Sequence, residues 1–508
     1  AWGFRLDTSP LKYLESPKEA WASVSHLPVF WGTLFFLLLY LLLLYVSKRF
    51  ITAGRKLIFP PLNRSVSFIV VLLLTGLFII PLRGGLQLAP INQSSVYFSQ
   101  SNFANLAAIN APWNFLFSLT HNTSSGNNPF IYIENNEADS ILKDLFQAGN
   151  KNQQFINLSK HPSPNVILIV WESFSSKAID LEKEGRFITP GFNLLKQEGI
   201  YFSNLYASGD RTDKGIVAVL SGYPSQPTTS IIKIPAKAAG LPMVSNLFNR
   251  KGYDNSFYYG GELEFANIKA YLLNGAFNKM ISVNDFSEND KNSKWGAHDG
   301  VVMKRLIGDL GKSKQPFFSA WLTLSSHEPF ETPVPAVLHG NDDETLFLNS
   351  LHYSDAVVYE FVRECRQQQW WDNTLIAIVA DHGHRLPSTG KKPDDFKIPF
   401  LLLGGVLDSV KADIKAIGSQ TDIPAILLSQ LGYDHSVFKW SKNLLDSTVK
   451  QWGYFSFNNG FGFIQPSNYF VFDNQGKRII EKQGNVKATD IKKGQAILQK
   501  SFQDYLEK

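Results

Sequence analysis

The sequence predicts an α/β domain with a mainly parallel central sheet and helices on both faces, preceded by transmembrane helices. Three observations support this. Short apolar runs alternate with helical stretches between about residues 165 and 440, and such alternation is typical of parallel sheets. Three of the runs end in residues suited to metal chemistry. Two uncharged apolar segments of 18 residues precede the domain, each just long enough to cross a bilayer.

The two apolar segments, Val29–Val46 and Ser65–Leu82, define a membrane part spanning residues 1–82. A buried core helix is the alternative interpretation of either segment. The loop between them carries only basic charges, at Lys48, Arg49, Arg55, Lys56 and Arg64. The positive-inside rule therefore predicts a cytoplasmic loop, with both flanking parts of the chain on the outer face.

Residue 1 is Ala, and on this topology it would lie outside. We therefore expect further membrane helices upstream of the sequence. Residues 1–28 lack the basic start and the short apolar region of a signal peptide.

Composition limits the class of protein. A chain of 508 residues predicts at least two regions. Its charged fraction of 18% is low and its aromatic fraction of 13% is high, as expected for a membrane part joined to a globular part. The net charge of +5 is too weak to imply nucleic acid. The lone Cys365 excludes an intrachain disulfide.

Residues 83–164 are polar but contain several aromatic residues, which are unusual in a disordered linker. We expect a linker that packs partly on the domain, with short helices around Phe103–Thr120. The catalytic domain would span residues 165–450. The tail, 451–508, predicts small antiparallel strands (Tyr454–Phe463, Tyr469–Phe472) and a closing helix at Lys492–Leu506.

Apolar runs and helical periodicity give the elements of the central domain. The predicted strands are Val166–Val170, Ile200–Tyr206, Asn255–Tyr259, Phe317–Leu324, Leu375–Ala380 and Ile398–Leu403. The predicted helices are Pro190–Gln197, Lys214–Leu220, Met243–Arg250, Asp299–Asp309, Leu346–Gln368 and Asp422–Leu431.

Three strand ends carry the candidate site. Glu172 follows the first strand, Asp381-His382-Gly383-His384 follows Leu375–Ala380, and His327 follows Phe317–Leu324 after two serines. Ligands bind beyond the carboxyl ends of parallel strands, and Asp oxygen and His nitrogen are ligands for Zn²⁺ or Mn²⁺. Glu172 could instead be an exposed loop residue or a helix cap, and His327 a structural loop residue. His384 could be a substrate contact or a further loop residue.

A threonine supplies the candidate nucleophile. Thr212 lies between Arg211 and a helix expected to begin near Lys214, where free N–H groups and the helix dipole favour an anion. Metal coordination would lower the pKa of its hydroxyl. A helix cap is the commoner use of Thr here. Arg211 and Lys214 could offset phosphate charge or remain solvated.

Four ordered motifs resemble the lipoteichoic acid synthase-like enzymes, membrane-anchored phosphoglycerol transferases of the sulfatase/alkaline phosphatase superfamily. They are Asn165–Phe174 (NVILIVWESF), Arg211-Thr212-Asp213 leading into Leu220–Pro224, Trp321–Phe330 (WLTLSSHEPF) and Ala380–Gly383 (ADHG). The resemblance covers roughly Asn165 to Gly432 and the preceding membrane helices.

The resemblance implies that Glu172, Thr212, Asp381 and His382 bind one divalent ion, Mn²⁺ in the synthases, with Mg²⁺ or Zn²⁺ as alternatives. It implies that Thr212 is the nucleophile and forms a phospho-threonine by displacing diacylglycerol from a lipid head group. His327 matches the histidine that binds the substrate phosphate.

One stretch departs from that family. Where the synthases have a His and then Trp-x-Arg contacting glycerol phosphate, this chain has Tyr259, Ala266 and Ile268. Tyr259, at the position of that His, is the predicted substrate contact of this stretch. The resemblance therefore extends to relatives that move phosphoglycerol or phosphoethanolamine from a phospholipid onto envelope glycans or lipids. It implies a multi-pass protein of the bacterial inner membrane, with the catalytic domain on the periplasmic or extracellular side. Cys365 lacks the context of a formylglycine precursor, which argues against sulfate ester hydrolysis.

Two alternatives stay open from the residues alone. A phosphodiesterase or phosphatase would use the same intermediate with water as the acceptor. A catalytically silent envelope protein would use the fold as a binding module. Substitution of Thr212 discriminates between the enzyme and the scaffold.

Overall fold

The computed structural model describes residues 29–54, 63–88, 90–121, 127–149, 151–458 and 460–508. They fall into two compact units. The first takes the described residues of 1–91 and 103–123, and the second takes those of 92–102 and 124–508. Residues 1–28, together with Arg55 and Lys56 of the basic loop, lie outside the described residues.

The first unit is helical. It contains α2 (Val29–Gly54), α3 (Arg64–Arg83), α4 (Asn102–Ala108) and α5 (Ala111–His121). Two of these helices are long and apolar enough to cross a membrane, over Phe30–Phe50 and Arg64–Pro81. The Asn63 side chain accepts a hydrogen bond from the Ser65 N–H at the start of α3. The short helices α4 and α5 lie where the sequence predicts helices in the linker.

The second unit is built on a large, mostly parallel sheet, which confirms the predicted fold class. Strand β11 (Gly418–Ser419) pairs with β4, and the other strands lie in the following order: β10 (Ala412–Ile414), β4 (Ile200–Tyr206), β9 (Lys397–Leu403), β8 (Thr374–Ala380), β1 (Asn165–Trp171), β7 (Phe317–Leu322), β5 (Asp254–Tyr259) and β6 (Lys279–Ile281). All seven residues of β1 and of β8 are buried, as expected for a sheet covered on both faces.

One strand boundary needs correction, and β9 is antiparallel to its neighbours in the mainly parallel sheet. The strand predicted to end at Leu324 ends at Leu322, because Thr323 and Leu324 already belong to the loop that turns toward the site. Strand β9 runs antiparallel to β8 and to β4. A parallel neighbour needs a long crossover, usually a helix. The segment between β8 and β9 holds only loop and the 3₁₀ turn Lys392–Asp395.

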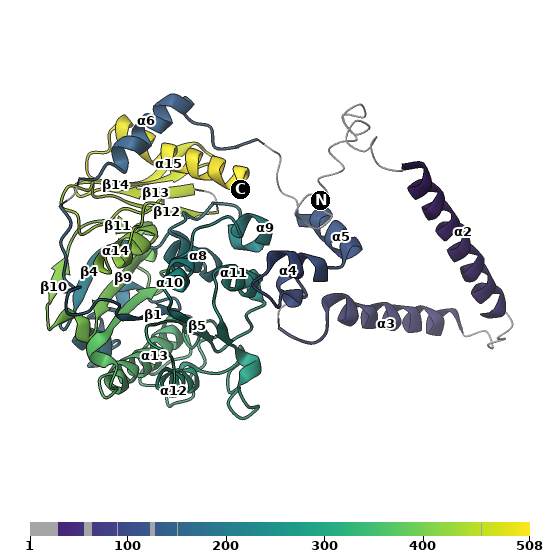
Figure 1. Cartoon of the computed structure of the whole chain (residues 1–508), viewed down its shortest axis with the longest axis horizontal. Helices are drawn as coiled ribbons and strands as arrows, with labels where there is room; N and C mark the ends of the chain where they lie inside the picture. Colours follow the sequence, from purple (N-terminus) through teal and green to yellow (C-terminus); the bar gives the residue numbers. More distant parts are fainter. Residues whose placement is uncertain (1–28, 55–62, 89, 122–126, 150, 459) are drawn as a thin grey trace. The chain divides into compact units, whose positions relative to one another are not determined.

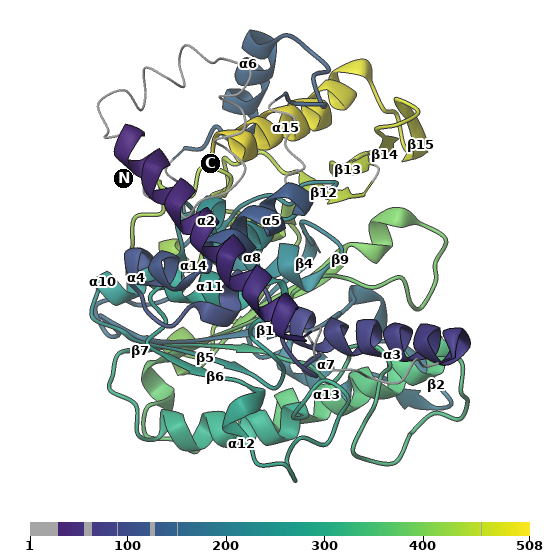
Figure 2. The same ribbon diagram turned by 90° about the vertical axis from the view of Figure 1, so that its right-hand side faces the viewer.

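Helices cover both faces of this sheet (Figures 1 and 2). One face carries α7 (Pro190–Leu195), α12 (Asp299–Leu310) and α13 (Asp343–Cys365). The other carries α8 (Thr212–Ser221), α10 (Val244–Arg250), α11 (Ile268–Asn274) and α14 (Ile423–Gln430), and the short α9 (Pro235–Ala238) contacts α11. The hairpin of β2 (Glu182–Lys183) and β3 (Arg186–Phe187) lies outside the sheet.

A second, antiparallel sheet forms the carboxyl-terminal part. Its order is β12 (Gly453–Phe457), β13 (Gly460–Ile464), β14 (Tyr469–Asp473) and β15 (Arg478–Gln483). The helix α15 (Ala488–Glu507) packs on β13 and on α6 (Asn135–Leu145). Helix α6, within residues 83–164, is not predicted from the sequence. The side chain of Gln499, in α15, holds the segment that precedes α6, because its Oε1 accepts a hydrogen bond from the Tyr132 N–H at 2.9 Å.

Strand register decides where the site forms. Trp171 of β1 pairs with Ala380 of β8, and Val170 pairs with Leu322 of β7. The parallel strands β1 and β8 therefore end level with each other, and Glu172 and Asp381 leave the sheet at the same edge. Because β4 is antiparallel to β9, it runs parallel to β8 and also ends at this edge.

Candidate active site

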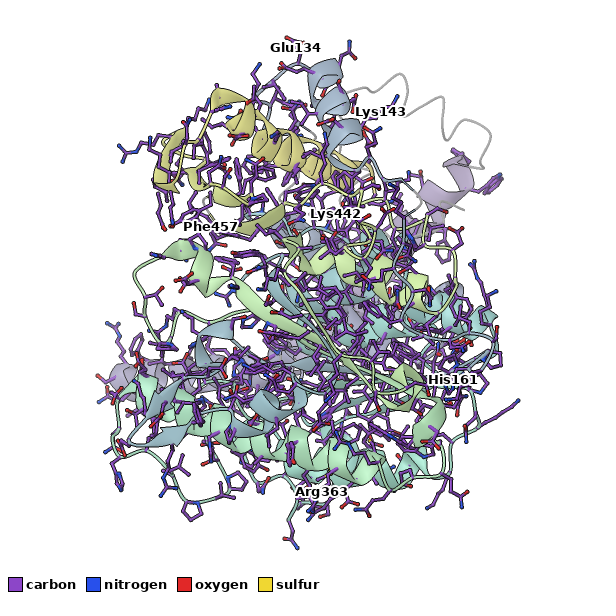
Figure 3. All side chains as sticks on the ribbon, turned by 90° about the vertical axis from the view of Figure 1, so that its left-hand side faces the viewer. Glu134, Lys143, His161, Arg363, Lys442 and Phe457 are labelled. Atoms are coloured by element: carbon purple, nitrogen blue, oxygen red, sulfur yellow. The ribbon has the colours of Figure 1, made fainter. Side chains whose placement is uncertain are left out.

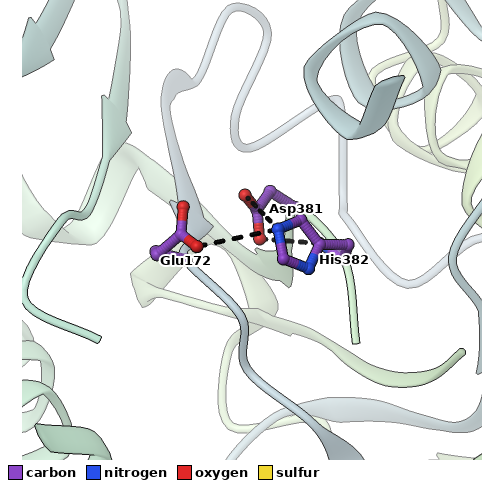
Figure 4. Close-up of side chains that lie close together, drawn as sticks. All are labelled: Glu172, Asp381 and His382. Carbon is purple, nitrogen blue, oxygen red and sulfur yellow. Dashed lines mark hydrogen bonds and ion pairs between the residues drawn. The ribbon is translucent and has the colours of Figure 1, made fainter. Parts of the chain in front are cut away.

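Glu172, Asp381 and His382 form a compact cluster at this edge of the sheet (Figure 4). Their ligand atoms lie within 4.8 Å of one another. The Nε2 atom of His382 is 3.6 Å from Oε1 of Glu172 and 3.5 Å from Oδ2 of Asp381. All three residues are nearly or fully buried. Among the described residues, this is the group of His, Cys, Asp and Glu side chains whose spacing suits a metal ion.

The histidine is oriented for coordination. Its Nδ1 lies 2.7 Å from the carbonyl oxygen of Gly383, so Nδ1 carries the proton and donates to that oxygen. The Nε2 atom is then left to face the two carboxylates. A hydrogen bond from one ring nitrogen that fixes the other as the ligand is the usual arrangement around metal-binding histidines.

Hydrogen bonds fix the main chain of Glu172 and the carboxylate of Asp381. The N–H of Glu172 donates to Oγ1 of Thr323 at 2.8 Å, and the hydroxyl of Ser326 donates to the Glu172 carbonyl at 2.5 Å. Oδ1 of Asp381 accepts from the Ser173 N–H at 2.8 Å and from the His382 N–H at 2.6 Å. The ends of β1, β7 and β8 are therefore tied together around the cluster.

The electrostatics of the cluster call for a cation. Burial and the neighbouring charge of Glu172 raise the pKa of Asp381 to about 8. Burial opposes ionisation of Glu172 as well, but His382 and His327 hold its pKa below the ordinary value. Oδ2 of Asp381 is buried and has no hydrogen-bond partner. Two carboxylates confined this closely are unfavourable unless a positive charge compensates them.

Thr212 is the first residue of α8 and lies beside the cluster. Its hydroxyl donates to Oε2 of Glu172 at 3.1 Å. The residues that follow, Asp213 to Ser221, are all buried, so the start of the helix is fixed in place. Free N–H groups and the helix dipole at such a start favour an anion.

A cleft of about 460 Å³ opens above these residues, within the size range of small-ligand sites. Among the predicted residues, Glu172, Arg211, Thr212, His327, His382 and His384 line it. His384 is largely buried against Phe347, at 4.0 Å between ring centroids. Burial, followed by the charge of His382, lowers the pKa of His384 to about 4.

Tyr259 is placed differently from these six residues. It is absent from the residues that line the cleft. Tyr259 is nevertheless close enough to the cluster to sense its charges. Burial, followed by the charges of Glu172 and Asp381, raises the pKa of the Tyr259 hydroxyl. The sequence prediction of a substrate contact at Tyr259 therefore stays a prediction.

Several residues of the site are not predicted from the sequence. Asp210, Lys233, Phe265, Lys392 and Asp395 also line the cleft. Asp210 could have been found from its place two residues before Thr212. The others come from loops that no local pattern connects with the strand ends.

The His327 loop has two further supports. The carboxylate of Asp299, at the start of α12, accepts hydrogen bonds from the N–H groups of Leu324 at 2.7 Å and Ser325 at 3.1 Å. The indole N–H of Trp295 donates to the Glu328 carbonyl at 2.7 Å, and this carbonyl also accepts from Nδ1 of His327 at 2.9 Å. His327 thus has Nε2 left for a substrate.

The sulfatase family model matches residues 164–433, more than half of the 508 residues. The chain belongs to the sulfatase family. The match includes every predicted site residue from Glu172 to His384. It ends near Gly432, before the antiparallel carboxyl-terminal sheet.

Curated relatives include lipoteichoic acid synthases. Lipoteichoic acid synthase 2 of Bacillus subtilis (strain 168) is 25% identical over 258 residues, which cover 48% of this chain and 39% of the relative. Lipoteichoic acid synthase of Staphylococcus aureus (strain bovine RF122 / ET3-1) is 25% identical over 273 residues, covering 49% and 42%. The chain thus spans less than half the length of these two relatives.

Solved structures share the fold. A protein of the alkaline phosphatase superfamily from Vibrio parahaemolyticus superposes with a TM-score of 0.64 at 22% identity, over 75% of this chain and 98% of that one. The lipoteichoic acid synthase LtaP from Listeria monocytogenes gives 0.60 at 17% identity, over 74% and 98%. At these identities the likeness establishes the fold, and the activity rests on the site.

Proposed function

We propose that the protein is a membrane-anchored, metal-dependent phosphotransferase. It moves a phosphoglycerol or phosphoethanolamine head group from a phospholipid to an envelope glycan or lipid, through a phospho-threonine at Thr212. The single observation that carries this proposal is the Thr212 hydroxyl at a helix start, 3.1 Å from Glu172 and beside the ligand cluster. The named activity of the lipoteichoic acid synthase relatives supports the same class of reaction.

The residues present fit a divalent cation. The unpartnered Oδ2 of Asp381, the oriented Nε2 of His382 and the carboxylate of Glu172 supply oxygen and nitrogen ligands, and Thr212 would add its hydroxyl. This donor set suits Mn²⁺, with Zn²⁺ and Mg²⁺ as alternatives. The cation would lower the pKa of the Thr212 hydroxyl and offset the charge of the phosphoryl group.

In the first step, Oγ1 of Thr212 forms a bond to phosphorus, and the bond from phosphorus to the diacylglycerol oxygen breaks. The proton of the hydroxyl passes toward Oε2 of Glu172, which already accepts it. His327 in its doubly protonated form, in which both ring nitrogens are donors, donates a hydrogen bond through Nε2 to a phosphoryl oxygen, and Arg211 at the cleft rim supplies positive charge. The leaving diacylglycerol oxygen takes a proton from solvent.

In the second step, a hydroxyl of the acceptor attacks the phosphorus. The bond from phosphorus to Thr212 breaks, and the threonine oxygen takes back its proton from Oε2 of Glu172. The acceptor hydroxyl loses its proton to the solvent that fills the open cleft. A cleft of about 460 Å³ is large enough for a head group and part of an acceptor.

Membrane anchoring serves this chemistry. The helices α2 and α3 would span the inner membrane and keep the catalytic unit on its outer face, in line with the basic loop between them. Tethering raises the effective concentration of lipid head groups at the cleft.

Mass spectrometry of the intact protein after incubation with mixed phospholipids and MnCl₂ tests the proposal. We expect one head-group phosphate on Thr212, and its mass identifies the donor. Thr212→Ala should abolish both the adduct and the release of diacylglycerol. Thr389→Ala, at an exposed loop threonine outside the cleft, is the matched control and should keep both. Unchanged turnover in Thr212→Ala would refute the proposal.

The same assay distinguishes transferase from hydrolase. A glycan acceptor added after lipid should clear the adduct and gain the head group in a transferase. Release of free phosphorylated head group at the same rate with and without acceptor would assign a phosphodiesterase. A protein that neither binds Mn²⁺ nor turns over any lipid would be a binding module.

A further inference from the structure

Gln420 occupies a buried position between the two segments that carry the chemistry. It begins a short 3₁₀ turn, Gln420–Asp422, directly after β11, and it is fully buried. Strand β11 pairs with the last residues of β4, Gly418 with Leu205 and Ser419 with Tyr206. Gln420 therefore lies at the carboxyl edge of the sheet, just beyond the end of β4.

The side-chain amide of Gln420 makes three hydrogen bonds to main-chain atoms. Its Nε2 donates to the carbonyl oxygens of Ala380 and Asp381, each at 2.7 Å. Its Oε1 accepts from the Ser208 N–H at 3.1 Å. The chemistry fixes the orientation of the amide, because two carbonyls need donors and an N–H needs an acceptor.

These three partners lie at or just beyond the strand ends: Ala380 is the last residue of β8, and Asp381 and Ser208 follow β8 and β4. The last pair between β8 and β9 is Val379 with Phe400, so the next carbonyls of β8 lack a partner on that strand. Ser208 lies beyond the end of β4, four residues before Thr212. The side-chain amide of Gln420 thus supplies hydrogen bonds where the pairing of β8 with β9 has ended. It joins the end of β8, at Asp381, to the loop that leads to Thr212.

The turn that carries Gln420 is itself rigidly held. The carboxylate of Asp422 accepts hydrogen bonds from the Ser419 N–H at 2.8 Å and the Lys442 N–H at 3.0 Å. It also forms an ion pair with the ammonium group of Lys442, and both side chains are buried. The Lys442 ammonium, labelled in Figure 3, lies 4.0 Å from the centroid of the Trp452 ring.

We propose that Gln420 is a positioning residue for the reaction: it fixes the distance between Thr212 and the Asp381 ligand. This inference rests on the proposed function. Gln420 is not among the residues that line the cleft, so it acts through the main chain at Ser208, Ala380 and Asp381. Partners of this kind behind a metal ligand typically contribute about 10- to 100-fold in metal affinity or activity.

The test is Gln420→Met in the full chain, with Gln430→Met as the matched control. Gln430 ends α14, is equally buried, and bridges main-chain atoms of a different segment. Its Nε2 donates to the Gln153 carbonyl and its Oε1 accepts from the Phe155 N–H, each at 2.8 Å. Both variants keep side-chain length and lose a buried amide, so a purely structural role would affect them alike.

Three readouts are compared. They are kcat for diacylglycerol release, Mn²⁺ affinity of the metal-stripped protein by titration calorimetry, and hydrogen exchange over residues 207–214. In Gln420→Met we expect kcat and Mn²⁺ affinity to fall about 10- to 100-fold, with little change in KM and faster exchange at Ser208. In Gln430→Met kcat and affinity should stay within about threefold. If Gln420→Met does not fold, Gln420→Asn keeps the amide one methylene short, and we expect a smaller loss of the same kind.

Equal values in the Gln420 and Gln430 variants would overturn the inference while leaving the proposed function intact. The proposed function fails by a different result, when the wild-type chain releases no diacylglycerol and Thr212 gains no phosphate. Mn²⁺ affinity and hydrogen exchange would then still decide whether Gln420 holds the two segments together.

Discussion

Helix α8, which begins at Thr212, approaches the end of β8 at Asp381 so closely that it tolerates no side chain at Gly215. A Cβ atom added at Gly215 would lie 1.9 Å from the carbonyl oxygen of Asp381 and 2.6 Å from its carbonyl carbon. Both are backbone atoms, so no side-chain rotation relieves the clash. Gly215→Ala is therefore the smallest change that pushes the helix of Thr212 away from Asp381.

The size of the effect follows from the distance. Moving from 1.9 Å to an ordinary contact of 3.4 Å requires a shift of about 1.5 Å. Thr212 is three residues earlier on the same helix and moves with it. A misplacement of about 1 Å can cost about 100-fold in rate. Overpacking costs about 1–3 kcal/mol of unfolding free energy, and the helix preference of Ala offsets about 1 kcal/mol of it.

The assay is the rate of diacylglycerol release in saturating MnCl₂, together with the thermal midpoint of unfolding. We expect Gly215→Ala to lose about 100-fold in kcat with a net destabilisation of about 0–2 kcal/mol. Gly308→Ala is the control, since Gly308 lies in α12 and a Cβ there meets no atom within 4 Å. It should gain up to about 1 kcal/mol and keep full activity. Full activity in Gly215→Ala would refute the reasoning.

Three further predictions concern the surroundings of the site. Asp299→Asn replaces one of the two acceptor oxygens for the Leu324 and Ser325 N–H groups with an NH₂ donor, so it should cost about 1–3 kcal/mol and lower kcat by loosening the His327 loop; a variant with wild-type Tm and kcat would contradict this. Nδ1 of His384 accepts a hydrogen bond from the Leu386 N–H, and the pKa of His384 is lowered to about 4. The unfolded chain therefore binds a proton at this histidine more readily than the folded state does. The free energy of unfolding consequently falls as pH drops from about 6.5 toward 4. His384→Phe should reduce the loss between pH 7 and pH 4.5 by up to about 2 kcal/mol, and an unchanged loss in denaturant titrations would exclude this origin. Chelation should lower Tm, and Mn²⁺ should restore it more strongly at pH 8 than at pH 5.5. The reason is that the pKa of Asp381 is raised to about 8. From about pH 4 to 8 the metal-free folded state therefore binds more protons than the unfolded chain, and it loses stability as pH rises. Equal Tm gains at both pH values would exclude Asp381 as the origin of the pH dependence.

Local patterns in the sequence were enough to predict the sheet and part of the site. A strand buried on both faces has a mostly apolar run, and such runs mark β1, β7, β8 and β9, whereas β4 and β5 carry polar residues beside shorter apolar stretches. Parallel strands place their carboxyl ends at one edge, so Glu172 and Asp381-His382 could be expected to meet. The two apolar helices were equally evident, because bilayer thickness sets their length.

The tertiary structure alone decided how the edge of the sheet is assembled. Nothing local distinguishes β9 from a parallel strand, because its direction depends on the connection from β8. Gln420 bonds to Ser208 across 212 residues of sequence, and Gly215 is required by the approach of another segment's backbone. Burial patterns depend on neighbours along the chain, whereas hydrogen bonds and close contacts between segments depend on how the strands are ordered in space. The sequence by itself thus determined which residues could do chemistry, and only the folded chain determined the contacts that place Thr212 beside Glu172.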